Sequence, residues 1–168
     1  MRRFVAFQHR DFRRYFVGQV ISNVGTWLQA LAVTWLVLDL TGRSDRLGVV
    51  VALQFLPLLI LGAPAGVLAD RVDNRRLLLI TSAVSAALAL AFGLVVSGGT
   101  EDLRVIYGLT FLSGLVLAVE RPAMQALLFQ LVGHDALPSA VATNSSIASV
   151  SRLIGPALGG AMISITGV

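Results

Sequence analysis

The sequence contains no cysteine and no lysine, and it has few charged residues. Without cysteine, neither a disulfide framework nor a thiolate metal site can form. Only 13% of the 168 residues are charged, whereas a typical soluble domain carries about 25%, so this chain cannot cover a globular surface with charge. The two histidines, His9 and His134, lie far apart, and the sequence shows neither metal-ligand spacing nor a nucleophile beside a base. We therefore expect no metal, no cofactor and no enzymatic activity.

The 13 basic residues are all arginine, and their placement argues against a nucleic-acid-binding surface. Most of them lie at the ends of apolar blocks, whereas a nucleic-acid-binding protein gathers them on a basic face interleaved with aromatics. The net charge of +4 therefore reflects arginines that flank apolar segments, and nucleic acid is not an expected partner.

Hydrophobic residues make up 56% of the chain and form five long blocks rather than short amphipathic stripes. The blocks span residues 15–38, 47–69, 77–97, 105–127 and 141–166. Each has a length near the about 20 residues that a helix needs to cross a hydrocarbon core about 30 Å thick. Backbone groups in lipid must form hydrogen bonds within their own segment, as they do in a helix. The first block exceeds the roughly 7–15 residues of a cleavable signal core. We predict an all-α integral membrane protein, with a basic tail at 1–14 and a bundle of five transmembrane helices at 15–168.

The arginines between the blocks are distributed unequally over the two sides of the membrane. The 1–14 tail holds five and the connection at 70–76 holds three, which makes eight on one side. The opposite side holds three, namely Arg43, Arg46 and Arg104. Because arginine-rich connections stay in the cytoplasm, we expect a multi-pass protein of the cell (inner) membrane with a cytoplasmic N-terminus and the lipid bilayer as its surroundings.

The first predicted helix carries a polar stripe. Its members recur at spacings of three and four: Gln19, Ser22, Asn23, Thr26 and Gln29. Lipid does not favour such a face, which must therefore meet protein or water. Two interpretations stay open: the stripe lines a substrate cavity, or it makes hydrogen bonds between helices, each worth about 0.6 kcal/mol. We interpret Trp27 and Trp35 as packing or lipid-facing residues.

Glycines and prolines recur together in two of the predicted helices. The second has Gly62, Pro64 and Gly66, and the fifth has Ser151, Gly155, Pro156 and Gly159. Small residues four apart let another helix approach closely. Inverted three-helix repeats would produce such a likeness, and two independent packing motifs would explain it equally well.

Three charged residues lie inside predicted spans: Glu120, Arg121 and Arg152. A charge near the bilayer centre costs at least about 2.5–3.5 kcal/mol, so each should have a partner. Glu120 and Arg152 can pair if the fourth and fifth helices are antiparallel neighbours. The pair would be either a gate or proton-linked switch, or a static ion pair that neutralises two charges.

The connection at 66–76 follows the second predicted helix and combines two acids with three arginines. A topology anchor would need only the arginines. Asp70 stands at the end of the helix, where an acid can cap the N-terminus of another helix and pair with nearby arginines. Such contacts can break when helices move, so the connection is either an anchor or a latch.

This connection resembles the signature of the major facilitator superfamily: a glycine, a leucine two residues on, then aspartate and arginine, and a basic pair before an apolar helix. Those places are filled by Gly66, Leu68, Asp70, Arg71, Arg75 and Arg76. Asp73 replaces the usual second glycine, and Asn74 replaces a usual basic residue. An aspartate at that place resembles the branch that exports drugs and siderophores.

Three further strings are similar to motifs of that branch. The first helix has Gly18-Gln19, Ser22-Asn23 and Gly25-Thr26-Trp27, the fourth has 120–126, and the fifth has 152–160. The last string resembles a motif associated with antiporters. The likeness, which is to exporters such as enterobactin and macrolide efflux proteins, covers nearly the whole chain.

The resemblance implies a twelve-helix fold of two six-helix halves that works by alternating access. The five predicted helices would form part of the N-terminal half, so we expect a fragment or a truncated product, with the missing C-terminal half as its partner. The substrates would be small amphipathic compounds, with protons as the coupling ion. The alternative is a truncated membrane module that packs against a partner and transports nothing.

The resemblance and the polar pattern together assign roles to individual residues. The substrate cavity would be lined by Gln19, Asn23, Thr26, Gln54 and Asn144. The inner gate would use the loop motif of Gly66, Asp70, Arg71, Arg75 and Arg76, with Glu120 as a possible acidic partner. Close packing of the fifth helix would rest on Gly155, Pro156, Gly159 and Gly160.

Overall fold

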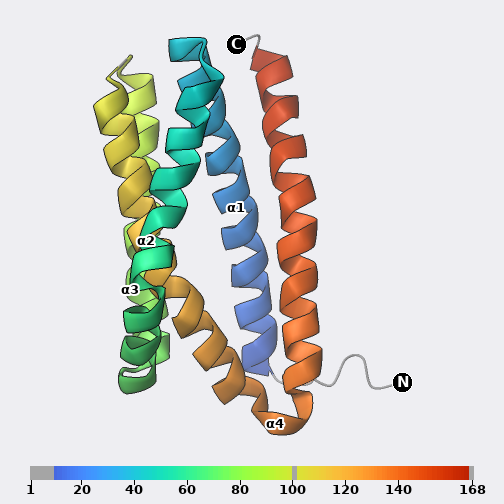
Figure 1. Ribbon diagram of the computed structural model, residues 1–168. Coiled ribbons are helices and arrows are strands. Elements are labelled where there is room, and N and C mark those ends of the chain that lie inside the picture. Colours follow the sequence, from blue (N-terminus) through green and yellow to red (C-terminus); the bar gives the residue numbers. More distant parts are fainter. Residues whose placement is uncertain (1–9, 100–101, 167–168) are drawn as a thin grey trace. The chain divides into compact units, whose positions relative to one another are not determined.

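The computed structural model describes residues 10–99 and 102–166, and within these stretches it contains four helical runs and no strand. The runs are α1 (Arg10–Thr41), α2 (Ser44–Arg71), α3 (Asn74–Ser97) and α4 (Leu103–Thr166), as Figure 1 shows. The prediction of an all-α architecture is confirmed.

Four segments of the described chain are long and apolar enough to cross a membrane. They are Phe16–Thr41, Ser44–Arg71, Asn74–Ser97 and Leu103–Gln130. These segments contain nearly all of the first four predicted blocks, and the helices extend beyond the blocks at one or both ends because backbone hydrogen bonding continues after the apolar run has ended. The chain is a multi-pass membrane protein.

The fourth and fifth predicted helices, 105–127 and 141–166, belong to one helical run of 64 residues, α4. Polar residues end an apolar block without breaking the hydrogen bonds between residues i and i−4. The sequence therefore showed where the apolar character is interrupted between the two blocks, and the residues that connect the blocks are helical.

The chain packs as two compact units. Unit 1 joins the residues up to Val33 to those from Leu128 onward, and unit 2 consists of Thr34–Leu127. Unit 1 thus pairs the first part of α1 with the last part of α4, which Figure 1 colours blue and red. Unit 2 contains α2, α3 and the first part of α4. Both α1 and α4 contribute to each unit.

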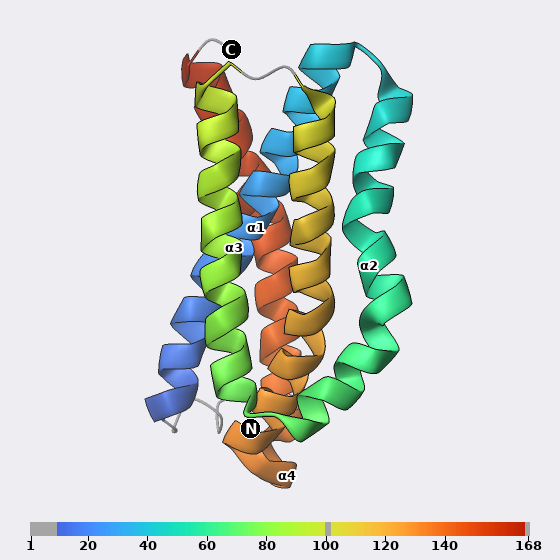
Figure 2. The same ribbon diagram turned by 90° about the vertical axis from the view of Figure 1, so that its left-hand side faces the viewer.

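Helix α2 curves along its length, as Figure 2 shows, and Pro57 and Pro64 lie inside it. Each proline removes one backbone N–H and crowds the carbonyl four residues earlier. Prolines are a common cause of helix bending, so the curvature of α2 follows from its sequence.

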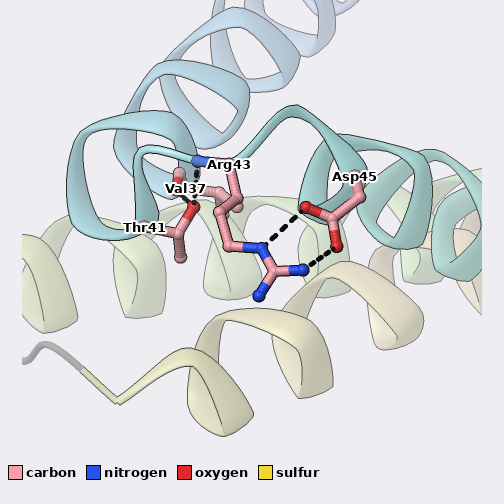
Figure 3. Close-up of polar contacts among 4 residues, drawn as sticks. All are labelled: Val37, Thr41, Arg43 and Asp45. Carbon is pink, nitrogen blue, oxygen red and sulfur yellow. Dashed lines mark hydrogen bonds and ion pairs between the residues drawn. The ribbon is translucent and has the colours of Figure 1, made fainter.

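A two-residue connection joins α1 to α2 (Figure 3). Gly42 has a φ of +60° and its N–H donates to the Leu38 carbonyl at 2.7 Å, which ends α1 in a left-handed cap. Arg43 then forms two hydrogen bonds with Asp45, from Nε to Oδ1 at 2.9 Å and from Nη2 to Oδ2 at 2.8 Å. The glycine and the ion pair together direct the chain into α2.

Large apolar side chains cover the outside of the helices. Leu59, Leu94 and Leu153 are 83%, 73% and 75% exposed. Exposure to water would cost about 25 cal/mol for each Å² of apolar surface, whereas contact with lipid or with further helices would not. The apolar surface therefore agrees with a bundle that is embedded in a bilayer.

Candidate functional site

The turn between α2 and α3 is organised by Asp73, the residue that departs from the superfamily signature. Its Oδ1 accepts hydrogen bonds from the backbone N–H groups of Arg75, at 2.9 Å, and Arg76, at 3.3 Å. Its Oδ2 lies 3.5 Å from Nε of Arg76. Asp73 is thus the N-cap of α3 and also the ion-pair partner of an arginine in the first turn.

Asp70, an acid that can cap the N-terminus of another helix, lies in the last turn of α2 and is exposed. Arg71, Arg75 and Arg76 are exposed as well, and Gly66 lies one turn earlier on α2. In the described chain, the cap of the following helix is made by Asp73 rather than by Asp70. The charged groups of the loop motif are therefore presented on the surface of unit 2 at one end of α2 and α3.

Asn74 is a feature of this turn that sequence reasoning missed. Its side chain is 2% exposed, and no hydrogen-bond partner of its Oδ1 occurs among the described residues. An unpaired buried acceptor costs about 1–3 kcal/mol. The pattern offered one signal, because Asn74 stands between a capping aspartate and an arginine pair, where a charged residue is usual.

Close backbone contact joins α2 to the first part of α4 in unit 2. A Cβ built on Gly114 would lie 2.5 Å from the backbone oxygen of Gln54 and 3.0 Å from that of Leu53. Pro57 is fully buried and supplies no N–H to the Leu53 carbonyl, four residues earlier. Glycine at 114 is therefore required for this approach, which places the backbone of Gln54, a predicted cavity residue, directly against α4.

A second glycine contact joins α1 to the last part of α4 in unit 1. A Cβ built on Gly155 would lie 2.5 Å from Cβ of Trp27, and one on Gly159 would lie 2.5 Å from Cδ2 of Leu31. Gly160 faces open space, with no atom within 4 Å of an added Cβ among the described residues. Pro156, beside this contact, is half-buried. The structure thus places two of the three glycines of the 152–160 string against α1.

Arg152 lies one turn before Gly155, at the edge of the same contact. The carbon atom of its guanidinium group is 4.9 Å from the centroid of the Trp27 ring, within the range of a cation–π interaction. Ser151, beside it, is fully buried. Trp27 therefore contacts both a glycine and a cation of α4, a role that the sequence did not indicate.

The polar stripe of α1 satisfies some of its donors within its own helix. Nδ2 of Asn23 donates to the Gln19 carbonyl and Oγ1 of Thr26 donates to the Ser22 carbonyl, both at 2.9 Å. Gln19 and Asn23 are half-buried, whereas Thr26 is exposed. Asn144 of α4, also in unit 1, is half-buried. These four predicted cavity residues share a unit, and Gln54 belongs to the other.

A family model described as transmembrane secretion effector matches residues 2–168. The chain belongs to this family of major facilitator transporters. The predicted resemblance is confirmed. Curated relatives include the staphyloferrin A transporter of Staphylococcus aureus, which is 32% identical over 152 residues. Macrolide efflux protein A of Streptococcus pyogenes is 23% identical over 154 residues, and multidrug efflux pump Tap of Mycobacterium tuberculosis is 27% identical over 159 residues.

These alignments cover most of this chain and a minority of each relative. For the staphyloferrin A transporter, the alignment covers 90% of this chain and 38% of the relative. The corresponding shares are 92% and 38% for the macrolide efflux protein, and 88% and 36% for Tap. The chain therefore spans somewhat more than a third of the length of these relatives. No solved structure matches the chain.

The charged residues that were predicted to lie inside spans are divided between the units. Glu120 is half-buried and Arg121 is exposed in the first part of α4, which belongs to unit 2. Arg152 belongs to unit 1, where its described neighbour is the Trp27 ring. The pairing of Glu120 with Arg152 therefore stays a prediction.

Proposed function

We propose that this chain supplies the N-terminal helices of a secondary active exporter of small amphipathic compounds. The match of residues 2–168 to the transmembrane secretion effector family carries this proposal. The names of its relatives specify staphyloferrin A, macrolides and multidrug efflux. Polar and charged side chains inside otherwise apolar helices support it, because such residues commonly mark substrate or ion pathways.

We propose that the substrate cavity is lined by Gln19, Asn23, Thr26, Gln54 and Asn144. The alternative interpretation of the α1 stripe required hydrogen bonds between helices. Asn23 and Thr26 instead donate to carbonyls of their own helix. Donors that are satisfied within α1 leave the stripe available to face water or a substrate, which favours the cavity.

The inner gate is assigned to the turn between α2 and α3. Asp70, Arg71 and Arg75 would form a latch that opens and closes as the helices move, as alternating access requires. Their exposure supports this role, because exposed charges can exchange partners without being buried unpaired. The cap that Asp73 makes on α3 would keep the turn in register during such a movement.

The placement of charged residues supports an orientation of the chain in the membrane and a coupling ion. The excess of arginine in the N-terminal tail and the α2–α3 turn favours a cytoplasmic N-terminus in the inner membrane. Glu120 is the acidic residue of the described spans that lies away from a span end. We assign it the proton-carrying role in an antiport mechanism.

The test is dye efflux from bacteria that express the complete gene in a host without its own drug exporters. We expect faster efflux of a fluorescent amphipathic dye than in vector controls, and a loss of this efflux when a protonophore collapses the gradient. Asp70→Ala should slow efflux, whereas Asp39→Ala, at an exposed acid near the end of α1, should not. Efflux at the vector rate would contradict export, efflux that survives the protonophore would contradict proton coupling, and an unchanged Asp70→Ala rate would remove the latch.

A further inference from the structure

Arg152 is a cation in unit 1 without an acidic residue near it in the sequence. Neither 16–33 of α1 nor 141–161 of α4 contains aspartate or glutamate. The described neighbour of the guanidinium group is the Trp27 ring, at 4.9 Å from its centroid. Whatever balances the charge of Arg152 must therefore come from outside these two segments.

The contact with Trp27 leaves the charge of the guanidinium group in place. An indole ring attracts a cation through its quadrupole and has no net charge. The five N–H donors of arginine lie in the plane of the group, and they match the two oxygens of a carboxylate. Arg152 is exposed, so these donors are accessible in this unit.

The glycine contact between α1 and α4 fixes this arrangement. Gly155 packs on Cβ of Trp27 and on the backbone nitrogen of Leu28, and Gly159 packs on Leu31 one turn further along. The backbone positions of Trp27 and Arg152 are thus set by the same contact. A recognition group that is already held in place loses less entropy when a ligand binds.

We propose that Arg152, which lies over the Trp27 ring, binds a carboxylate of the transported compound, so that the substrates include amphipathic acids. This inference rests on the proposed export function and specifies its substrate class. The polar stripe supports it by position, because Gln19, Asn23 and Trp27 are spaced four residues apart and share one face of α1. The polar stripe and the Trp27 ring that contacts Arg152 therefore lie on the same face of α1.

Two xanthene dyes of similar size and opposite charge test the inference in cells that express the complete gene. Fluorescein carries a carboxylate, and rhodamine 6G is a cationic ester. We expect Arg152→Gln to raise the apparent KM for fluorescein export about 10-fold to 100-fold, the loss that corresponds to a charge-assisted hydrogen bond. Rhodamine 6G export should be unchanged, Arg152→Lys should be intermediate, and Arg104→Gln, at an exposed arginine in the first turn of α4, should leave both dyes unaffected.

The outcomes separate this inference from the function on which it rests. If neither dye leaves the cells faster than in vector controls, the export function is contradicted, and this inference falls with it. If rhodamine 6G alone is exported, or if Arg152→Gln exports fluorescein with an unchanged KM, only the carboxylate inference is overturned. Equal losses of both dyes in Arg152→Gln would also overturn it, because a carboxylate contact predicts a loss for fluorescein alone.

A second measurement covers the case in which Arg152→Gln does not reach the membrane. Fluorescein should raise the midpoint of thermal unfolding of the purified wild-type protein, because a ligand that binds only the folded state stabilises it. Arg152→Lys should show a smaller shift than the wild type with fluorescein, and the same shift as the wild type with rhodamine 6G. Absence of any fluorescein shift in the wild type would overturn the inference.

Discussion

The contact between Gly155 and Trp27 gives a quantitative prediction about the packing of unit 1. In Gly155→Ala, the added methyl group would lie 2.5 Å from Cβ of Trp27 and 3.3 Å from the backbone nitrogen of Leu28. Neither atom can rotate away, because one is the first atom of its side chain and the other belongs to the backbone of α1. The two helices must therefore separate for the methyl group to fit.

The size of the effect follows from two opposing contributions. Overpacking costs about 1–3 kcal/mol, and replacing a helical glycine by alanine gains up to about 1 kcal/mol. We expect Gly155→Ala to lower the free energy of unfolding by about 2 kcal/mol, which is the upper end of the overpacking cost less the helical gain, because neither contacted atom can move away. Gly159→Ala should be nearly neutral, since its methyl group would meet Cδ2 of Leu31, the mobile end of a side chain.

Thermal unfolding of the detergent-purified product of the complete gene is the assay, and Gly160→Ala is the matched control. No described atom lies within 4 Å of a Cβ added at Gly160, so that variant should unfold at the wild-type temperature or above it. Each kcal/mol corresponds to about 2–4 °C in a chain of this size, so Gly155→Ala should unfold several degrees lower. If Gly155→Ala unfolds at the same temperature as Gly160→Ala, α1 and α4 do not make this close contact.

Two further predictions concern unit 2. Asp73→Ala should destabilise the start of α3 by about 0.5–2 kcal/mol, as lost N-caps do, whereas Asp73→Asn should retain most of the cap. Faster hydrogen exchange at the Arg75 amide in Asp73→Ala than in Asp73→Asn would support this prediction, and equal exchange in the two variants would contradict it. Gly114→Ala should lower the free energy of unfolding by about 1–3 kcal/mol, because its methyl group would meet the Gln54 carbonyl at 2.5 Å, while Gly108→Ala meets nothing within 4 Å and should be tolerated. Equal unfolding temperatures for the two glycine variants would contradict this account.

The long helices could be predicted from the sequence because lipid imposes a simple rule. A segment that crosses a bilayer must be apolar and must satisfy its own backbone, so each apolar block specifies a helix. The rule marks where lipid contact ends, and it gives no information on where hydrogen bonding ends. That is why α1 already includes Arg10, before the apolar run from residue 15, and why α4 continues from 127 to 141 without interruption.

The candidate site was less predictable, because its contacts depend on which helices meet. The sequence contained a local signal for the cap, since Asp73 directly precedes α3, but the superfamily signature drew attention to Asp70 instead. The small residues of the 152–160 string indicated close packing without naming α1 as the partner. The contact of Arg152 with Trp27 depends on the register between two helical segments that lie more than 120 residues apart in the sequence. Hydrophobic pattern alone does not specify such a register.

The energetics of Arg152 connect the packing of unit 1 to its chemistry. An arginine at the centre of a membrane helix costs about 2.5–3.5 kcal/mol on insertion scales, while a cation–π contact returns about 0.5–1 kcal/mol when exposed and about 2 kcal/mol when desolvated. At the centre of a span, the Trp27 ring would therefore leave about 0.5–3 kcal/mol uncompensated. Packing against α1 does not require a cation at this position, since Gly155 and Gly159 make the close contacts. A residue that costs more than its contacts return is characteristic of a functional site, which favours a functional role for Arg152 over a packing role.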